Sequence, residues 1–350
     1  MRIAQIAPLA ESVPPKLYGG TERVIAWLTD ELLELGHHVT LFASGDSVTQ
    51  AELAPVWPRA LRLAKQATDP AAAYALLLEM LARRIDEFDV VHCHIDWTPL
   101  PLLSRLSTPY LTTCHGRLDL SGLAYVVKNF PAAPFVSISD DQRRPLPEAN
   151  WLGTVHHGMP TSLLKPSFDE GSYLAFLGRL TPEKGPHIAI RIAKACGMPL
   201  RIAAKLPGGE RRFYKDVLEP LIDGKQIELI GEVGDGAKQA FLADARALVF
   251  PINWPEPFGL VMIEAMACGT PIIAFSAGSV PEIVEDGVTG FIVQSEEEAI
   301  DTIKHRLPRL DRRTVRKEFE RRFTAYQMAQ SYVEYYQALI AGRRRLLPAG

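Results

Sequence analysis

The sequence predicts an α/β protein with two doubly wound domains, each a parallel sheet covered by helices on both faces. Short apolar runs alternate with helical patterns from one end of the chain to the other, as expected for repeated βα units. A polar stretch at Met159–Gly171 interrupts this alternation, which restarts at Ser172. At 350 residues the chain is also longer than one domain of ordinary size. We therefore expect two series of units joined by this stretch.

The first series begins with an apolar run that predicts a strand at Arg2–Ala7. A helix is expected near Thr21–Leu35, because apolar residues recur there at helical spacing and Gly36 follows, a residue suited to a helix C-terminus. The residues of this apolar stripe are Val24, Ile25, Leu28, Leu32 and Leu35. Further buried strands are predicted at His38–Ala43, Val90–His94, Tyr110–Cys114 and Pro134–Ser139.

The second series repeats the pattern after residue 172. Strands are predicted at Tyr173–Leu177, Leu200–Ala204, Ile227–Ile230, Ala247–Pro251, Pro271–Ala274 and Phe291–Val293. The chain closes with a helical pattern at Tyr326–Ala341, which three consecutive arginines follow at 343–345.

The composition excludes several classes of protein. Apolar residues make up 47% and charged residues 23%, which is typical of a globular protein and not of a disordered one. The net charge of −3 provides no overall field that would recruit nucleic acid, so no nucleic-acid partner is expected. Four cysteines without paired spacing indicate reduced thiols. With neither a bilayer-length apolar run nor a signal peptide pattern, we expect a cytoplasmic protein.

The C-terminal stretch is locally basic. From Asp301 to Gly350 there are twelve Lys or Arg residues against five Asp or Glu. A solvated helical face with a basic tail is the simpler interpretation. The alternative is peripheral contact with the anionic inner face of a membrane.

A pair of glycines follows the first predicted strand. Gly19 and Gly20 stand in Tyr18-Gly-Gly-Thr-Glu-Arg23, where a helix is expected to begin. Glycines at a helix N-terminus let backbone N–H groups approach an anion. A tight turn explains the same pattern, and the segment is neither a dinucleotide fingerprint nor a Walker A loop.

Two cations lie five residues apart after the first strand of the second series. Arg179 and Lys184 belong to Gly178-Arg-Leu-Thr-Pro-Glu-Lys-Gly185. On a strand-to-helix loop they can converge on a diphosphate, Arg179 as a planar fork and Lys184 as a mobile point charge. Surface cations without a ligand are the alternative.

The third segment carries two glutamates eight residues apart. Glu256 and Glu264 stand in Trp254-Pro-Glu-Pro-Phe-Gly-Leu-Val-Met-Ile-Glu-Ala265. If Glu256 flanks a helix N-terminus, two turns bring both carboxylates toward one cleft. Compensation of the helix dipole would explain Glu256 but not Glu264, which lies in an apolar helix and needs a polar partner such as a sugar hydroxyl.

The fourth segment is rich in histidine. His92, His94 and Asp96 alternate along the end of one predicted strand, and His115 follows the next. If the strand persists, the first three share one side. A metal site is one interpretation, but hydrogen-bonding residues that line a cleft are favoured.

Taken in this order, the four segments resemble the retaining glycosyltransferases of glycosyltransferase family 4, which have the GT-B fold. The resemblance covers nearly the full length, through Ile3–Phe42, Asp89–Trp97, Thr113–Gly116, Val136–Asp140, Trp151–Gly158, Leu177–Gly185 and Phe250–Val293. It implies two Rossmann-like domains that face a central cleft. Residues 1–165 would form the acceptor-side domain, residues 166–325 would bind the nucleotide sugar, and residues 326–350 would form a helix that returns to the first domain.

The resemblance also implies roles for individual residues. Gly19 and Gly20 would lie beside the donor diphosphate, which Arg179 and Lys184 would neutralise. Glu256 would touch the transferred sugar, Glu264 would hold the ribose, and His115 would face the reacting sugar. The amides of Phe258, Gly259 and Leu260 would cap a phosphate, and His94 and Asp96 would lie on the acceptor side.

The implied activity is transfer of a hexose from a UDP-, GDP- or ADP-linked donor to a glycan, lipid-linked or small-molecule acceptor. No cofactor is expected, and the absence of Asp-x-Asp at a strand end agrees with a reaction that uses no metal. The stretch Ala203–Gly209 departs from the glycine-rich loop of many relatives. A sugar-nucleotide epimerase and a non-catalytic nucleotide-sugar-binding protein of the same fold are the alternatives.

Overall fold

A computed structural model describes residues 1–16, 19–64, 69–204 and 210–346 of the chain. Tyr18 and the stretch Lys205–Gly209, both singled out in the sequence, lie outside the described residues, as do the side chains of the three arginines at 343–345. The chain divides into two compact units. Unit 1 comprises Met1–Pro160 and Ala325–Gly350, and unit 2 comprises Thr161–Thr324.

Unit 1 is built on a parallel sheet. Within its described residues seven strands form, in the spatial order β3-β2-β1-β4-β5-β6-β7. They are β1 Arg2–Ile6, β2 His38–Ser44, β3 Glu52–Trp57, β4 Val90–Cys93, β5 Tyr110–Thr113, β6 Phe135–Ser137 and β7 Trp151–Thr154. Its helices are α1 Gly20–Glu34, α2 Pro70–Arg84, α3 Leu100–Leu103, α4 Leu123–Asn129 and α12 Ala325–Leu346.

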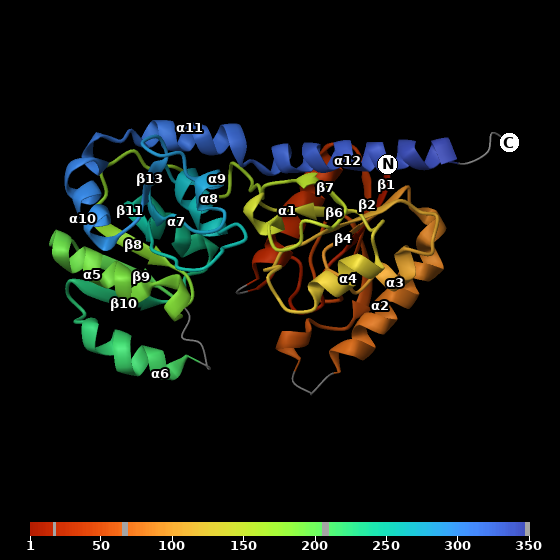
Figure 1. Ribbon diagram of the computed structural model, residues 1–350, viewed down its shortest axis with the longest axis horizontal. Helices are drawn as coiled ribbons and strands as arrows, with labels where there is room; N and C mark the ends of the chain where they lie inside the picture. Colours follow the sequence, from red (N-terminus) through yellow and green to blue (C-terminus); the bar gives the residue numbers. More distant parts are fainter. Residues whose placement is uncertain (17–18, 65–68, 205–209, 347–350) are drawn as a thin grey trace. The chain divides into compact units, whose positions relative to one another are not determined.

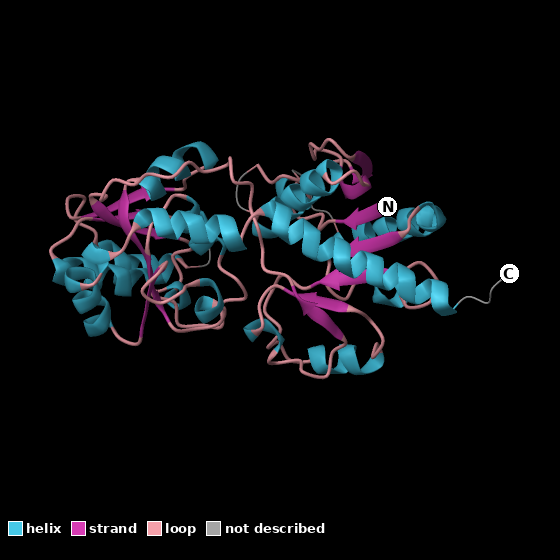
Figure 2. Cartoon of the chain, turned by 90° about the horizontal axis from the view of Figure 1, so that it is seen from above, coloured by secondary structure: helices cyan, strands magenta, loops and turns pink. Residues whose placement is uncertain are grey.

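Helices cover both faces of this sheet. Ala4 and Ile6 of β1 pack with Leu77 and Leu81 of α2 on one face. On the other face α12, 22 residues long, lies beside α1 and contacts β4, so the C-terminal helix runs across the strands of unit 1 (Figure 2). The alternation of β1 therefore directs Gln5, between Ala4 and Ile6, toward α12, where it meets Tyr336.

Unit 2 repeats the architecture with a smaller sheet (Figure 1). Its described residues form six parallel strands in the order β10-β9-β8-β11-β12-β13. The strands are β8 Tyr173–Leu177, β9 Leu200–Ala203, β10 Ile227–Gly231, β11 Ala245–Phe250, β12 Ile272–Phe275 and β13 Gly290–Val293. The helices are α5 Pro186–Cys196, α6 Arg211–Phe213, α7 Asp235–Ala243, α8 Leu260–Ala267, α9 Val280–Ile283, α10 Glu296–His305 and α11 Arg312–Arg322.

The sheet of unit 2 is also covered on both faces. α5 and α10 pack side by side, and their apolar residues form one core with the strands beneath them. α8 packs against both α7 and α11. This arrangement confirms the predicted α/β class with doubly wound parallel sheets.

The sequence did not predict two of the strands, β3 and β7, which form the two edges of the unit 1 sheet. β3 is the edge strand; it contains Pro55, and only Ala54 and Val56 of its six residues are buried. β7 is the opposite edge strand, and all four of its residues are half-buried. Edge strands bury less side-chain surface than central ones, so their apolar pattern is weaker.

The basic C-terminal stretch is partly internal, contrary to the expectation of a solvated face. Arg312 and Arg316 are buried and donate hydrogen bonds to backbone carbonyls of unit 2. Arg322 likewise donates to the carbonyls of Glu282 and Ile283. Within the part of the chain that the structure describes, no helix combines the length and the apolar character needed to cross a membrane.

Candidate functional site

Most of the segments singled out in the sequence follow the strands at which the strand order of each sheet reverses. In unit 1 the strand order reverses between β1 and β4, and in unit 2 between β8 and β11. Parallel sheets bind ligands outside the carboxyl ends of the strands at such switch points, where adjacent loops diverge. The loops after β1 and β4 carry Gly19 and His94, and those after β8 and β11 carry Lys184 and Glu256.

In unit 2 the loops after β8 and β11 lie against each other. The backbone N–H of Asn253 donates to the carbonyl of Glu183 at 2.9 Å. Gly185 has φ +70°, and a Cβ there would collide with the carbonyl oxygen of Pro251. Glycine at 185 thus allows both the left-handed turn and the close approach of the two loops.

This approach pairs Lys184 with Glu256. The ammonium of Lys184 forms an ion pair with Glu256 Oε2, and the two side chains are only 14% and 11% exposed. The same ammonium lies 4.7 Å from the centre of the Trp254 ring, a cation–π contact. Gly278 packs against the backbone of Glu256, whose carbonyl accepts a hydrogen bond from Ser279 N–H at 3.0 Å. Both predicted residues therefore occupy one tightly held site.

Arg179 lies differently from Lys184. Its side chain is 47% exposed and lies 3.6 Å from Glu183 in an i,i+4 ion pair. An exposed pair of this kind holds its partners weakly, so the guanidinium of Arg179 can exchange Glu183 for a ligand at low cost.

Glu264 has a partner that sequence reasoning missed. Lys238 of α7 lies 2.7 Å from Glu264 Oε1, and the two side chains are 13% and 7% exposed. The apolar surroundings of Glu264 predicted that it needs a polar partner, but they did not predict that α7 would supply one. The described part of unit 2 therefore includes two such Lys–Glu pairs, one just before α8 and one between α7 and α8.

α8 begins without a side-chain cap in the described structure. Its N-cap is Gly259, with φ 77°, and the helix starts at Leu260. A Cβ on Gly259 would come within 2.9 Å of the methyl carbon of Met262. The first backbone N–H groups of a helix carry partial positive charge, so this end of α8 suits an anion.

In unit 1, α1 begins in the same way. Gly20 is the first residue of the helix and Gly19 its N-cap, and no described side chain caps it. A Cβ on Gly19 would lie 2.7 Å from Pro15 Cβ. The space at Gly19 thus requires glycine, as expected where a backbone is to come close to a ligand.

His92, His94 and His115 of unit 1 belong to one hydrogen-bonded group. Nδ1 of His94 lies 2.9 Å from Nε2 of His115, and Nε2 of His94 lies 2.6 Å from Oε1 of Gln5. The ring of His157 stacks on that of His115 at 5.2 Å. Burial lowers the pKa of His115 to about 3 and holds that of His94 well below its ordinary value, so both rings are neutral at pH 7.

The condition under which Asp96 would share a face with His92 and His94, a strand that continues to residue 96, is not met. β4 ends at Cys93, and Asp96 has a left-handed backbone with φ 47°, so strand alternation does not extend to it. Burial raises the pKa of its carboxyl to about 6. A residue other than glycine in this conformation is strained, as is common at functional sites.

The nitrogens of His92 and His94 contact His115, Gln5, Thr113 and Tyr336. Among the described residues, no group of three His, Cys, Asp or Glu side chains has an arrangement that could hold a metal ion. All four cysteines are free, and three of them are buried.

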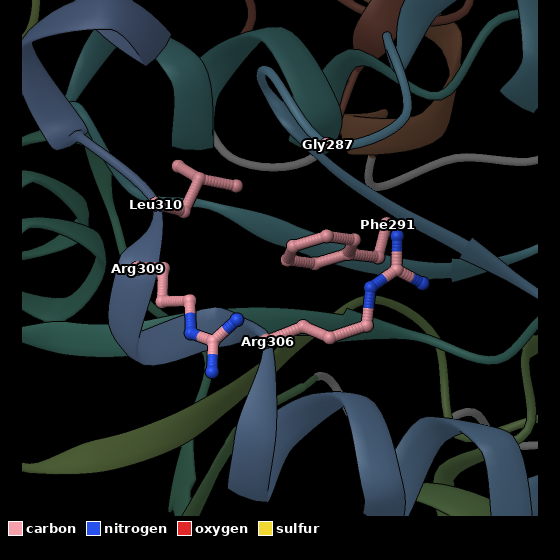
Figure 3. Close-up of a pocket in the computed structure, with 5 residues that line it drawn as sticks. All are labelled: Gly287, Phe291, Arg306, Arg309 and Leu310. Atoms are coloured by element: carbon pink, nitrogen blue, oxygen red, sulfur yellow. The ribbon is translucent and has the colours of Figure 1, made fainter.

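A separate hollow of about 220 Å³ lies in unit 2, at the amino end of β13 (Figure 3). Gly287, Phe291 and Leu310 line it together with two arginines, and Arg306 stacks over the Phe291 ring at 4.3 Å. Because the strands are parallel, this hollow lies at the sheet edge opposite the loops that carry Lys184 and Glu256.

Comparison with known families agrees with this geometry. A model described as Glycosyltransferase Family 4 matches residues 18–147, and one described as Glycosyl transferases group 1 matches residues 165–320. Together they match more than three quarters of the chain, and they divide it near the boundary between the units. The chain belongs to the family-4-like glycosyltransferases.

Curated relatives extend the comparison. D-inositol 3-phosphate glycosyltransferases of Mycobacterium bovis and Mycobacterium tuberculosis are 26% identical over 270 residues, 63% of this chain and 54% of theirs. The chain thus spans about half the length of the curated relatives that it matches.

Solved structures match along nearly the whole chain. AviGT4, a glycosyltransferase involved in avilamycin A biosynthesis, has a TM-score of 0.77 at 26% identity, covering 97% of this chain and 98% of its own. Sucrose-phosphate synthase from Thermosynechococcus elongatus also reaches 0.77, at 18% identity and coverage of 97% and 99%. Anabaena Alr3699/HepE in complex with UDP-glucose reaches 0.72, at 20% identity and coverage of 97% and 100%. These likenesses confirm the predicted GT-B fold.

Proposed function

We propose that this protein is a retaining glycosyltransferase that moves a hexose from a nucleotide-diphosphate sugar to an acceptor hydroxyl without a metal ion. One observation carries the proposal: the buried Lys184–Glu256 pair at the switch point of unit 2, together with the Lys238–Glu264 pair between α7 and α8. Two cations and two carboxylates held near α8, a helix that no described side chain caps, match a ligand that has both phosphates and hydroxyls.

We assign the cations and the helix amides to stabilising the nucleoside diphosphate that leaves. When the sugar departs, negative charge develops on the diphosphate oxygens. Lys184, Arg179 and the amides of Phe258, Gly259 and Leu260 are assigned to that charge, because dipoles and cations already in place stabilise it without reorganising. This division of labour replaces the metal ion that other transferases use for the same charge.

We assign the two carboxylates to accepting hydrogen bonds from hydroxyls of the donor. An ionised carboxylate accepts several hydrogen bonds, so Glu256 can keep Lys184 and also accept from a sugar hydroxyl. We assign Glu256 to the transferred sugar and Glu264 to the nucleotide ribose, as the resemblance implies.

In unit 1 we assign Gly19 and Gly20 to the donor diphosphate, His115 to the reacting sugar and Asp96 to the acceptor. His94 was expected on the acceptor side, but both of its ring nitrogens already have protein partners. The geometry favours a supporting role for His94 behind His115.

The proposed reaction retains configuration. The bond between the anomeric carbon and the diphosphate oxygen breaks, and the acceptor oxygen bonds to the same face of that carbon. The leaving phosphate oxygen takes the proton of the acceptor hydroxyl, so the products are the glycoside and the nucleoside diphosphate. Glu256 is not assigned as a nucleophile, although a carboxylate nucleophile is the usual route to retention.

The relatives support a nucleotide-sugar donor. Alr3699/HepE was solved with UDP and with UDP-glucose, and starch synthase IV from Arabidopsis thaliana with ADP and acarbose. We propose a UDP-, GDP- or ADP-linked hexose as donor and a glycan, lipid-linked or small-molecule acceptor. A cytoplasmic location, with or without peripheral contact at the inner membrane face, completes the proposal.

The decisive experiment incubates the protein with each nucleotide sugar, with and without an acceptor panel, and follows nucleotide release and products. We expect release that depends on the acceptor, a product with retained configuration, and activity that persists in a chelator. Isomerised donor would identify an epimerase, and binding without turnover a non-catalytic protein. Activity abolished by the chelator and restored by a divalent ion would contradict the metal-independent mechanism.

Glu256→Gln provides the matching test of the site. The amide keeps the shape and one acceptor oxygen but removes the charge, so we expect turnover to fall about a hundredfold or more and stability to fall by about 1–2 kcal/mol. Steady-state kinetics and urea unfolding measure the two effects. Glu228→Gln, at a half-exposed ion pair with Arg201 in the same unit, is the control. Equal proportional losses of turnover and of folded protein would show that Glu256 is only structural.

A further inference from the structure

A buried chain of hydrogen bonds connects the C-terminal helix of unit 1 to His115. From α12, the hydroxyl of Tyr336 lies 2.6 Å from Nδ1 of His92 and 3.3 Å from Nε2 of Gln5. Gln5 in turn contacts His94, and His94 contacts His115. Gln5, His92, His94 and Tyr336 are all buried.

Each imidazole in this chain carries one proton. Burial lowers the pKa of His92, His94 and His115, so all three are neutral at pH 7. A neutral imidazole has one N–H donor and one bare nitrogen acceptor. The direction of one hydrogen bond therefore decides the direction of the next.

The side-chain amide of Gln5 sets this direction. Its NH₂ group faces two atoms that can accept, the hydroxyl oxygen of Tyr336 at 3.3 Å and Nδ1 of His92 at 3.5 Å. Its carbonyl oxygen faces Nε2 of His94 at 2.6 Å. Because a carbonyl can only accept, the proton of His94 must be on Nε2.

The position of the proton on His94 then determines the position of the proton on His115. With its proton on Nε2, His94 presents a bare Nδ1 to His115, so Nε2–H of His115 donates the 2.9 Å bond between them. The remaining nitrogen of His115, Nδ1, is left as an acceptor. It is buried and has no hydrogen-bond partner among the described residues.

We propose that Gln5 and His94 are positioning residues that hold His115 in the Nε2–H tautomer, so that Nδ1 accepts a hydrogen bond from a hydroxyl of the bound sugar. Tyr336 and His92 orient the Gln5 amide. The tautomer follows from the protein alone, whereas its use on a sugar hydroxyl rests on the proposed function. In the opposite tautomer Nδ1–H would be a donor, and the geometry of recognition would change.

The test is nitrogen NMR of histidine-labelled protein at neutral pH without ligand, with the His115 signals assigned by comparison with His115→Asn. The expected spectrum shows a protonated Nε2 and an unprotonated Nδ1 for His115. A protonated Nδ1 overturns the proposal, and this result needs no other variant.

Two substitutions at Gln5 separate positioning from packing. Gln5→Met keeps the length but removes the carbonyl, and a mixture of His115 tautomers is expected. Gln5→Glu restores an oxygen that accepts from His94 and is expected to restore the single tautomer. Tyr74→Phe removes a hydroxyl of unit 1 that accepts from the backbone N–H of Leu9 and lies outside this chain of hydrogen bonds, so it should leave the tautomer unchanged. An unaltered His115 spectrum in folded Gln5→Met would refute the role of Gln5.

A final measurement tests the ligand. UDP-glucose, or the donor that the transfer assay selects, is added at saturation to the labelled protein. The Nδ1 signal of His115 should shift, while Nε2 stays protonated, and kcat of Gln5→Met should fall at least tenfold with KM for the donor little changed. A donor that binds without moving Nδ1 overturns the ligand half of the proposal. If no donor binds, the proposed function fails while the ligand-free spectrum still decides the tautomer.

Discussion

Lys184 and Lys238 place two ammonium groups in buried positions, each matched by one glutamate. A buried charge without a partner is costly, and a buried pair is only weak support for stability. Two such pairs beside one helix are therefore better explained by ligand binding than by folding. In the absence of a ligand, each glutamate supplies the counter-charge for its lysine, which keeps the ammonium group in place.

The first residue-scale prediction concerns the diphosphate. Arg179→Ala removes a half-exposed guanidinium, and Lys184→Ala removes a buried ammonium group and leaves Glu256 as a repelling charge. We expect nucleoside diphosphate affinity to fall about tenfold or more in each, since a charge-assisted hydrogen bond is lost. Isothermal calorimetry measures the affinity. Lys194→Ala, at an exposed lysine at the end of α5, is the control. Unchanged affinity in Arg179→Ala and Lys184→Ala would remove both residues from the donor site.

At the scale of elements, α11 is attached to unit 2 by arginines and not only by apolar contacts. Arg312 donates to the carbonyls of Ser167, Ala243 and Ala245 and to the hydroxyl of Thr270. It thus joins the entry into β8 to the starts of β11 and β12. β8 and β11 carry the Lys184 and Glu256 loops, so α11 supports the site from the opposite end of the sheet.

Arg312→Lys tests this support. Lysine has one ammonium group and cannot reproduce the planar fork, so several buried carbonyls lose their donors. We expect unit 2 to lose about 2–4 kcal/mol of stability. Urea unfolding measures it, with Arg309→Lys at an exposed position of the same stretch as control. Equal small effects in both variants would mean that the contacts of Arg312 contribute little.

At the scale of the whole molecule, buried histidines make unit 1 sensitive to acid. Burial lowers the pKa of His92, His94, His115 and His157 below the ordinary value of 6.5, for His115 to about 3. The unfolded chain then binds more protons than the folded one as the pH falls below 6.5. The stability that these groups provide is fully present above that pH and is lost as the pH falls. Asp96 acts in the opposite direction, since its pKa rises from 3.8 to about 6.

We therefore expect the stability of unit 1 to fall as the pH drops from neutral toward 4, by up to about 1.4 kcal/mol per pH unit for each histidine. Asp96→Asn removes the opposing contribution, so its curve should be steeper between pH 4 and 6. Hydrogen exchange of peptides from β1, β4 and β5 across this range measures the effect within unit 1. Asp86→Asn, at an exposed residue, is the control. A curve for Asp96→Asn that runs parallel to the parent would contradict the assignment.

The central strands and the site loops could be predicted because their signals are local. β8 was predicted with its observed bounds, since a fully buried central strand is a continuous apolar run. Edge strands β3 and β7 gave no such signal. The apolar neighbours of Glu264 predicted that its carboxylate needs a polar partner. That partner, Lys238, lies on an amphipathic helix 26 residues earlier, and no local pattern distinguishes Lys238 from other lysines.

The order of residues by itself determined the α/β class, the two series of units and the loops that carry Gly19, Lys184, Glu256 and His115, because apolar period and turn chemistry act over a few residues. Only the tertiary structure decided which side chains meet: Lys184 with Glu256, Lys238 with Glu264, and Gln5 with Tyr336, 331 residues apart. Such pairings depend on how sheets and helices pack in three dimensions, and burial then sets the protonation of the histidines they enclose.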